Sequence, residues 1–248
     1  MPLGLLGKKL GMSQIFDQDG KLVPVTYIQA GPCYVVQHKT AATDGYDAIQ
    51  VGFEEKKEKN VNRPMTGHLK KAGVPMLRHI KEFRLNGDSN LESLPEVGST
   101  LDVNLFKAGD HIDVVGVSNA RGFTSPIKRW HTARGPESHG SMYHRRAGSQ
   151  GASSYPSRTW KNKHAAGQHG NTRSAVLNLV VVKADAEKNL LIVRGSVPGH
   201  NNSFVVIRPT IRAKKAARQL QLQVAAVERA KAGAAKVNPL KASKKGGK

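Results

Sequence analysis

Five histidines lie close together in the middle of the chain, and imidazole is the side chain that most often serves as a general base or a metal ligand. They are His131, His139, His144, His164 and His169. A metal site would need three or four ligands in a fixed set, yet Glu137 is the only carboxylate in residues 120–173, and no HxxxH or HExxH spacing occurs. Paired acids for acid–base catalysis are missing for the same reason. We therefore expect no metal site here.

The other groups that could take part in catalysis are isolated in the sequence. Cys33 is the single cysteine, so the chain can form neither an internal disulfide nor a cysteine-based zinc site, and we expect this thiol to be a small buried apolar group. The run Gly148-Ser-Gln-Gly151 lacks the Gly-Lys-Ser/Thr ending of a phosphate-binding loop, and its glycines instead allow a close approach to a ligand. We expect no enzyme activity, no cofactor and no small-molecule substrate.

Positive charge is the strongest chemical signal in the sequence. The chain has 248 residues and a net charge of +21, from 39 Lys and Arg against 18 Asp and Glu. Residues 1–119 hold 14 basic and 14 acidic residues, whereas residues 120–173 hold ten basic and one acidic, and residues 208–248 hold twelve basic and one acidic. A charge that is concentrated in this way favours a polyanionic partner, of which nucleic acid is the commonest.

The basic segment 120–173 cannot form a hydrophobic core of its own. Ile127 is its only Val, Ile or Leu, yet it carries five of the 13 aromatic residues of the chain. Cations neutralise phosphates, and aromatic rings stack on unpaired bases. We therefore predict that this segment becomes ordered against nucleic acid, and the alternative is a solvated, disordered linker.

The candidate RNA contacts fall into groups by chemistry. The cations expected to neutralise phosphates are Lys8, Lys9, Arg121, Lys128, Arg129, Arg145, Arg146, Arg158, Lys161, Lys163 and Arg173. The aromatic residues expected to pack or stack on RNA are Trp130, Tyr155 and Trp160. The histidines expected to donate hydrogen bonds are His139, His144, His164 and His169. Gly148 begins the expected tip of the segment, residues 148–156.

Short strand-like runs lie on both sides of this segment. Before it come Leu22–Gln29, Tyr34–Lys39, Ala48–Phe53 and His111–Val117, and after it come Val176–Ala184, Asn189–Gly195 and Phe204–Arg208. Such runs separated by turn residues predict a mainly β fold with a closed or nearly closed β-barrel, discontinuous in sequence. Pro64 and Gly73 predict a short helix over Met65–Ala72, within an α/β insertion at about residues 61–100.

The expected organisation has three parts. Residues 1–119 and 174–212 form the globular barrel domain, residues 120–173 an extended basic loop, and residues 213–248 a basic tail with a helical start over Ala213–Ala232 and a disordered end. No apolar run approaches 18 residues and the N-terminus does not read as a signal peptide, so we expect no membrane partner and a cytoplasmic location.

Several long motifs are similar to those of one family. They are Gly4–Phe16 (GLLGKKLGMSQIF), Lys81-Glu-Phe-Arg84, Gly116–Trp130 (GVSNARGFTSPIKRW), His144-Arg-Arg146, Ala166–Gly170 (AGQHG) and Val197-Pro-Gly199. In this order they resemble the bacterial form of the ribosomal protein L3 family of the large subunit, over about residues 1–212. The tail beyond is not covered by the resemblance.

The resemblance implies more than the composition does. It implies a barrel of the translation-factor kind with an α/β insertion, and a loop that runs from the subunit surface towards the peptidyl transferase centre. It also implies 23S-type rRNA and neighbouring large-subunit proteins as partners, a role in early subunit assembly, and no catalysis. The alternatives are a non-ribosomal nucleic-acid-binding protein, an enzyme with a histidine-lined loop, and a specialised paralogue or organellar member of the family.

Overall fold

The computed structural model describes residues 3–17, 19–85 and 94–210. Its strands are β1 (Leu5–Phe16), β2 (Leu22–Ala30), β3 (Cys33–Lys39), β4 (Ala48–Glu55), β5 (Leu77–Arg84), β6 (Thr100–Leu101), β7 (His111–Val117), β8 (Gly122–Thr124), β9 (Gly167–His169), β10 (Arg173–Asp185), β11 (Leu190–Arg194) and β12 (Phe204–Pro209). Its α-helices are α1 (Ala41–Asp44), α2 (Arg63–Lys71) and α3 (Pro126–Trp130). The mainly β class is confirmed, and the expected tail helix over Ala213–Ala232 lies outside the described residues.

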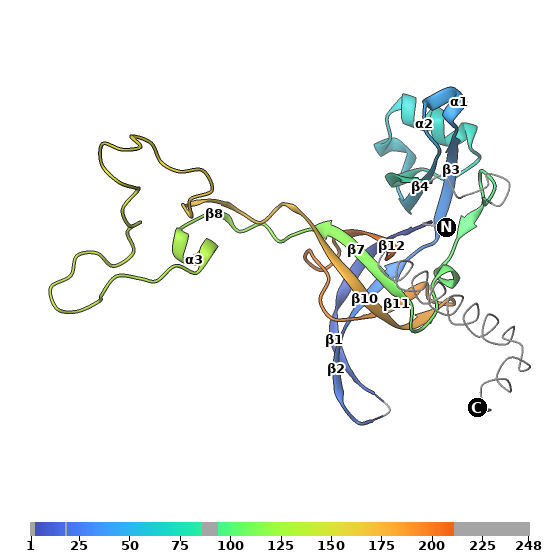
Figure 1. The fold of residues 1–248 in the computed structure, drawn as a ribbon. Helices are drawn as coiled ribbons and strands as arrows, with labels where there is room; N and C mark the ends of the chain where they lie inside the picture. The colour runs from blue at the N-terminus through green and yellow to red at the C-terminus, as the bar shows by residue number, and fades with distance from the viewer. Residues whose placement is uncertain (1–2, 18, 86–93, 211–248) are drawn as a thin grey trace, which may run out of the picture.

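A closed barrel forms the centre of the molecule. Its strands follow the order β1-β12-β7-β10-β11-β2, and each pair is antiparallel. β1, β2 and β7 precede the long central segment, and β10, β11 and β12 follow it (Figure 1). The interior is filled by fully buried side chains, including Leu5, Ile28, Ile112, Leu191 and Ile207. Burying one side chain of this size contributes about 1.5–3 kcal/mol to folding, so the core stabilises the barrel to which the second sheet and the central segment are attached.

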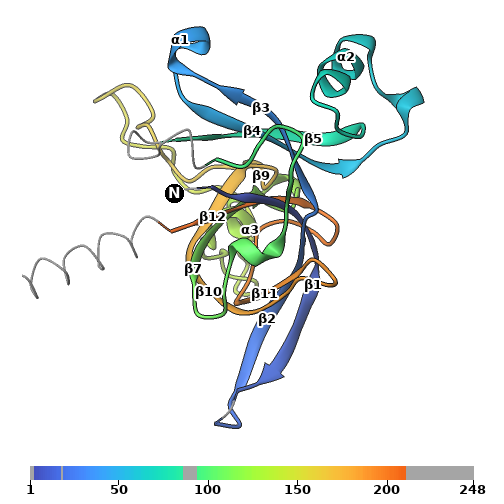
Figure 2. The same cartoon turned by 90° about the vertical axis from the view of Figure 1, so that its right-hand side faces the viewer.

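A second antiparallel sheet, in the order β5-β4-β3-β6, lies beside the barrel (Figure 2). Its buried residues Cys33, Val35 and Ile49 belong to the same hydrophobic cluster as the barrel interior. The runs expected at Tyr34–Lys39 and Ala48–Phe53 are strands, but they pair with each other and with β5 rather than with the barrel. The α/β insertion therefore begins at β3, well before residue 61.

The turn between β2 and β3 explains this boundary. Gly31 has φ +111°, in a region that L side chains rarely adopt, and it lies between the last barrel residue of β2 and the first residue of β3. The chain leaves the barrel at this point. The expected helix is α2, which packs Leu69 against Val36 and Leu77 and so covers one side of the second sheet.

The segment between β7 and β10 projects away from the barrel, and its two ends are paired (Figure 1). The pairing of Val117 with Arg173 is continued by the Ser118 N–H, which donates to the Thr172 carbonyl at 2.9 Å, and further out by the ladder of β8 with β9. We call this paired part, residues 117–124 and 167–173, the stem. The expected extended loop, residues 120–173, therefore has strand pairing at its two ends, which satisfies the backbone there without a hydrophobic core.

Gly170 lets the two sides of the stem come close together. It has φ +78°, and a Cβ built on it would lie 1.8 Å from the Asn119 carbonyl oxygen. Beyond the stem comes α3, which begins at Pro126 and ends at His131 with φ +57°. Residues 131–166 hold turns and bends and no regular helix or strand among those described. We call residues 125–166 the distal loop. No helix within the described ranges is long and apolar enough to span a membrane.

Candidate nucleic-acid interface

The cations of the stem and distal loop are mostly exposed. Within residues 120–173 as described, Arg134 and Glu137 form the one ion pair, so the segment's single carboxylate is already neutralised. The exposed cations among the predicted contacts are Arg121, Lys128, Arg145, Arg146, Arg158, Lys161, Lys163 and Arg173. These side chains have no carboxylate partner in the described structure, and their charge is available to an external anion.

Trp130 joins the two ends of the distal loop. Its indole N–H donates to the Ala165 carbonyl at 3.0 Å, and its ring lies parallel to that of His164, with centroids 4.3 Å apart. Arg129 also donates to the Ala165 carbonyl, at 3.2 Å, and its guanidinium carbon lies 5.0 Å from the centroid of the Trp130 ring. We call these contacts the clasp.

The clasp changes the interpretation of three predicted RNA contacts. Trp130, Arg129 and His164 bind one another and the loop backbone, rather than standing free for bases or phosphates. Gly167 is part of the arrangement, because a Cβ there would lie 2.4 Å from Nη1 of Arg129. The sequence could not reveal the clasp, because its partners lie more than thirty positions apart.

The other aromatic rings are available for stacking. Tyr155 is 88% exposed and Trp160 is 60% exposed, with the guanidinium carbon of Arg158 4.5 Å from the Trp160 ring centroid. Phe123 on β8 is 79% exposed and was not among the predicted contacts. The sequence could have indicated its exposure, because Phe123 lies in a segment with too few apolar residues to form a core around it. Lys163 donates to the Ser149 carbonyl, so this cation also ties residue 163 to the expected tip of the loop.

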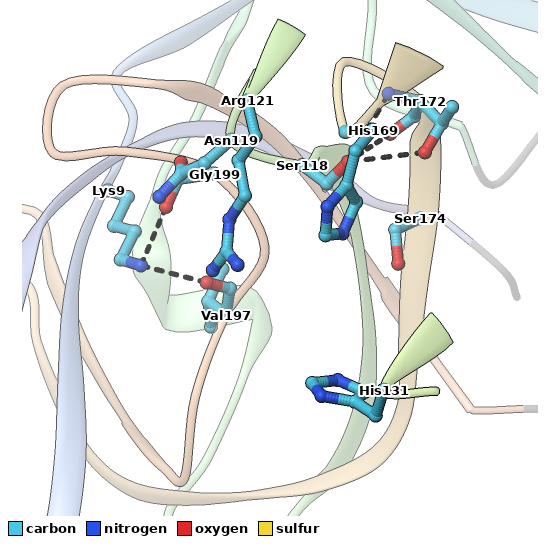
Figure 3. Close-up of a pocket in the computed structure, with 11 residues that line it drawn as sticks. Lys9, Ser118, Asn119, Arg121, His131, His169, Thr172, Ser174, Val197 and Gly199 are labelled. Atoms are coloured by element: carbon cyan, nitrogen blue, oxygen red, sulfur yellow. Dashed lines mark hydrogen bonds between the residues drawn. The ribbon is translucent and has the colours of Figure 1, made fainter. Parts of the chain in front are cut away.

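A cavity of about 630 Å³ opens where the stem leaves the barrel (Figure 3). Three of the predicted contacts, Lys9, Arg121 and His169, lie around it together with His131. The other lining residues are Ser118, Asn119, Gly170, Thr172, Ser174, Val197 and Gly199. We call it the root cavity. Among the lining residues that the structure describes there is no Asp or Glu, and Lys9 and Arg121 are cations, so the described lining carries positive charge.

The two lysines of the N-terminal motif differ from most of the loop cations. Lys9 is 7% exposed, and its ammonium group donates to the Val197 carbonyl at 2.8 Å and to the Gly199 carbonyl at 2.9 Å. Its burial lowers the pKa of Lys9 below its usual value. Lys8 pairs with Glu54 of β4 at 3.3 Å. Both amino groups therefore already bind protein atoms, as the amino group of Lys163 does in the distal loop.

Arg173 lines a second surface that is rich in cations and lies away from the distal loop. A groove of about 930 Å³ runs between the barrel and the second sheet, and Arg173 lines it with Lys81, Arg84 and Arg208. Glu82 is the one carboxylate among the lining residues described, and Lys39 contacts it at 3.0 Å. The described chain offers no partner to the buried Nε of Arg208. We call this the intersheet groove.

Sequence reasoning missed the groove because charge was summed by segment. The net charge of residues 1–119 is zero, but this sum does not show which carboxylates are paired with cations inside the domain. Desolvation would raise the pKa of Glu82, but hydrogen bonds from Lys39 and Tyr46 outweigh it and lower that pKa. Glu82 thus stays ionised beside Lys39 and leaves the neighbouring cations of the groove without a compensating charge.

The remaining candidates for chemistry stay apart. Within the residues that the structure describes, no three His, Cys, Asp or Glu side chains gather where they could hold a metal ion. His139 and His144 are exposed in the distal loop. Cys33 is fully buried and donates to the Leu6 carbonyl at 3.3 Å, and burial raises the pKa of its thiol to about 12. This agrees with the expected role of Cys33 as a small buried group.

The comparison with protein families gave one match. The family is described as ribosomal protein L3, and the match spans residues 28–189. This range covers more than half of the chain and includes the second sheet, β7, the stem, the distal loop and β10.

Proposed function

The chain belongs to the ribosomal protein L3 family of structural proteins of the large ribosomal subunit, and from this premise we propose how it acts there. It binds 23S-type rRNA, and its stem and distal loop run from the subunit surface towards the peptidyl transferase centre. The barrel domain, residues 1–119 and 174–212, docks at the surface, and residues 120–173 enter the RNA. By this means the protein helps the subunit to assemble early.

One observation carries the proposal. The segment that projects from the barrel bears eight exposed cations without a carboxylate partner in the described structure, and its only acid is paired with Arg134. Each cation that contacts a phosphate releases condensed counterions, so the affinity for free rRNA would depend steeply on salt. A segment without its own core gains most by packing between RNA helices, where Tyr155 and Trp160 have bases to stack on.

The stem and the clasp support this role mechanically. The paired strands β8 and β9 and the contacts of Trp130 fix the exit direction of the loop before RNA is bound. A preformed exit lowers the ordering entropy that binding must overcome. The intersheet groove adds Arg173, Arg208, Lys81 and Arg84 as a second phosphate-binding surface on the globular part.

The family is a structural one, and the proposed partners follow from that. They are 23S-type rRNA and neighbouring proteins of the large subunit, in cytoplasmic ribosomes, with no cofactor and no small-molecule substrate. The basic tail, residues 213–248, contributes charge by sequence and lies beyond the described residues. The alternative is a nucleic-acid-binding protein outside the ribosome or a specialised paralogue, which would not be present at one copy per subunit.

Sedimentation of a native lysate through a sucrose gradient in high salt tests the proposal. We expect about one copy per large subunit, retained at high salt. The variant with Arg145→Gln and Arg146→Gln should be incorporated less, whereas Lys21→Gln, in a surface pair with Asp19, should behave as the wild type. Loss of the wild-type protein at moderate salt, or equal affinity for duplex DNA, would contradict the proposal and favour the alternative.

A further inference from the structure

The root cavity has the composition of an anion site. We propose that it is a preformed binding site for one phosphate group, which in the ribosome is a phosphodiester of the rRNA backbone. That the ligand is RNA rests on the proposed function, whereas the preference for a phosphate rests on the lining residues alone.

The first argument is charge. Arg121 and Lys9 line the cavity as cations, His131 and His169 add two imidazoles, and no acidic residue is found in the described part of the lining. Lys9 has three N–H donors, of which two are used by the carbonyls of Val197 and Gly199. Its burial makes the pull on an anion stronger, because little water screens the ammonium group.

The second argument is a polar atom that lacks a partner. Nδ1 of His169 is buried, and the described chain gives it no hydrogen bond. Buried polar atoms are nearly always satisfied, so a group left in this state points to a ligand outside the chain. As an N–H, this nitrogen would donate to a phosphate oxygen, and Figure 3 shows the His169 ring beside the space that Arg121 and His131 also border.

The third argument is preorganisation. The Arg121 N–H donates to the His169 carbonyl at 2.8 Å, so the backbones that carry these two side chains are joined. His131 directly follows Trp130, which the clasp holds to Ala165. The backbones that carry these groups are therefore held in place without RNA, and a phosphate would bind without first having to order them.

The shape and chemistry of the cavity favour a phosphate that is part of a chain. Its volume of about 630 Å³ leaves room for the sugars on either side of a phosphodiester. Val197 is the one aliphatic side chain among the lining residues described, so an apolar ligand finds little surface there. Hydroxyls from Ser118, Thr172 and Ser174 provide further polar groups on the wall next to the stem.

Titration of the full-length, RNA-free protein tests the inference. Inorganic phosphate is added at constant ionic strength set with chloride, and binding is followed by the NMR signals of the arginine Nε–H and histidine ring protons. We expect saturable shifts at Arg121, His131 and His169. Arg121→Gln and His169→Gln should each weaken binding at least tenfold, and Arg63→Gln, exposed on α2 and far from the predicted contacts in sequence, serves as the matched control and should leave it unchanged.

A second arm uses the dinucleotide UpU, which carries one internal phosphodiester. Saturation by both probes supports the site as an RNA contact, whereas binding of phosphate without binding of UpU would overturn the RNA assignment. Shifts that never saturate, or an equal loss in Arg63→Gln, would overturn the site itself. Sedimentation with the large subunit is measured separately, so failure of the phosphate site and failure of the proposed ribosomal function give different results.

Discussion

The indole ring of Trp130 lies against the imidazole ring of His164, with centroids 4.3 Å apart and planes inclined by 5°. These residues stand at opposite ends of the distal loop, so their stacking closes it next to the stem. The clasp thus joins the paired stem to residues 131–166, which hold turns and bends but no regular helix or strand among those described.

Removing the Trp130 ring should loosen the stem. Trp130→Ala loses both the stacking on His164 and the hydrogen bond to Ala165, worth about 1–3 kcal/mol together. We expect faster hydrogen exchange at the amides of β8 and β9 and unchanged exchange in the barrel. Trp160→Ala is the control, because that ring contacts Arg158 and not the clasp. Equal effects of the two substitutions would mean that the clasp does not stabilise the stem.

Gly170→Ala should destabilise the stem for two reasons, the positive φ of this residue and the steric clash of the added Cβ. A left-handed residue with a Cβ costs about 1–2 kcal/mol, and at Gly170 the Cβ would also lie 1.8 Å from the Asn119 carbonyl oxygen. Gly140→Ala is the matched control, with φ +71° and no atom within 4 Å of the added Cβ. Hydrogen exchange in β8 and β9 measures the difference, and similar values for the two variants would contradict the close approach.

The intersheet groove makes its own prediction about RNA binding. Arg208→Gln should reduce the slope of log affinity against log salt by about one unit, as expected for one lost phosphate contact. Lys21→Gln should leave the slope unchanged, because Lys21 is exposed beside Asp19 and lies outside the groove. Filter binding to large-subunit rRNA over a range of salt concentrations gives both slopes. An unchanged slope in Arg208→Gln would exclude the groove from the interface.

Local pattern predicted the strands better than it predicted their partners. The run Leu22–Gln29 is within β2, and Ala48–Phe53 is within β4, but only β2 belongs to the barrel. Both runs are apolar enough to be buried on at least one face. Which sheet a strand joins depends on long-range pairing, here on the turn at Gly31, and the alternation of side chains does not encode it.

The same limit applies to the candidate site. Segment charge located the exposed cations such as Arg145 and Arg146, because a solvated segment keeps its charges available. It could not separate Lys9, which is buried, from its exposed neighbours in the chain, nor find the stacking of Trp130 on His164. Those properties arise only when distant segments meet, and the family resemblance supplied the motifs without supplying these contacts.

Cys33 should be unreactive in the folded protein. Burial raises the pKa of its thiol to about 12, so at pH 8 roughly one thiol in ten thousand is the reactive thiolate. We expect alkylation by iodoacetamide to be negligible in native buffer and complete in denaturant, as followed by mass spectrometry. The denatured sample is the control for the reagent. Rapid modification of the native protein would show that the core around Leu6 and Cys33 opens readily.

His79 should make folding stability sensitive to acid. Its ring stacks on Phe204 at 4.2 Å between centroids, and so joins β5 to barrel strand β12. Desolvation lowers the pKa of His79, and the nearby charges of Arg78, Lys8 and Lys81 act in the same direction, while Glu54 opposes them. The folded state therefore binds a proton at His79 less readily than the unfolded state does. The free energy of unfolding is unaffected above the unfolded pKa of about 6.5, and it decreases as the pH falls from there through the lower pKa of His79 in the folded state.

The substitution His79→Phe separates this proton from the stacking. The variant keeps an aromatic ring against Phe204 and removes the titrating group, so its free energy of unfolding should fall less than that of the wild type between pH 7.5 and pH 5. Urea unfolding at both pH values measures the difference, and His200→Phe, at an exposed position, is the control. Identical pH dependence of wild type and His79→Phe would mean that His79 binds a proton equally well in the folded and unfolded states. The contact between β5 and β12 would then not require a neutral His79 ring.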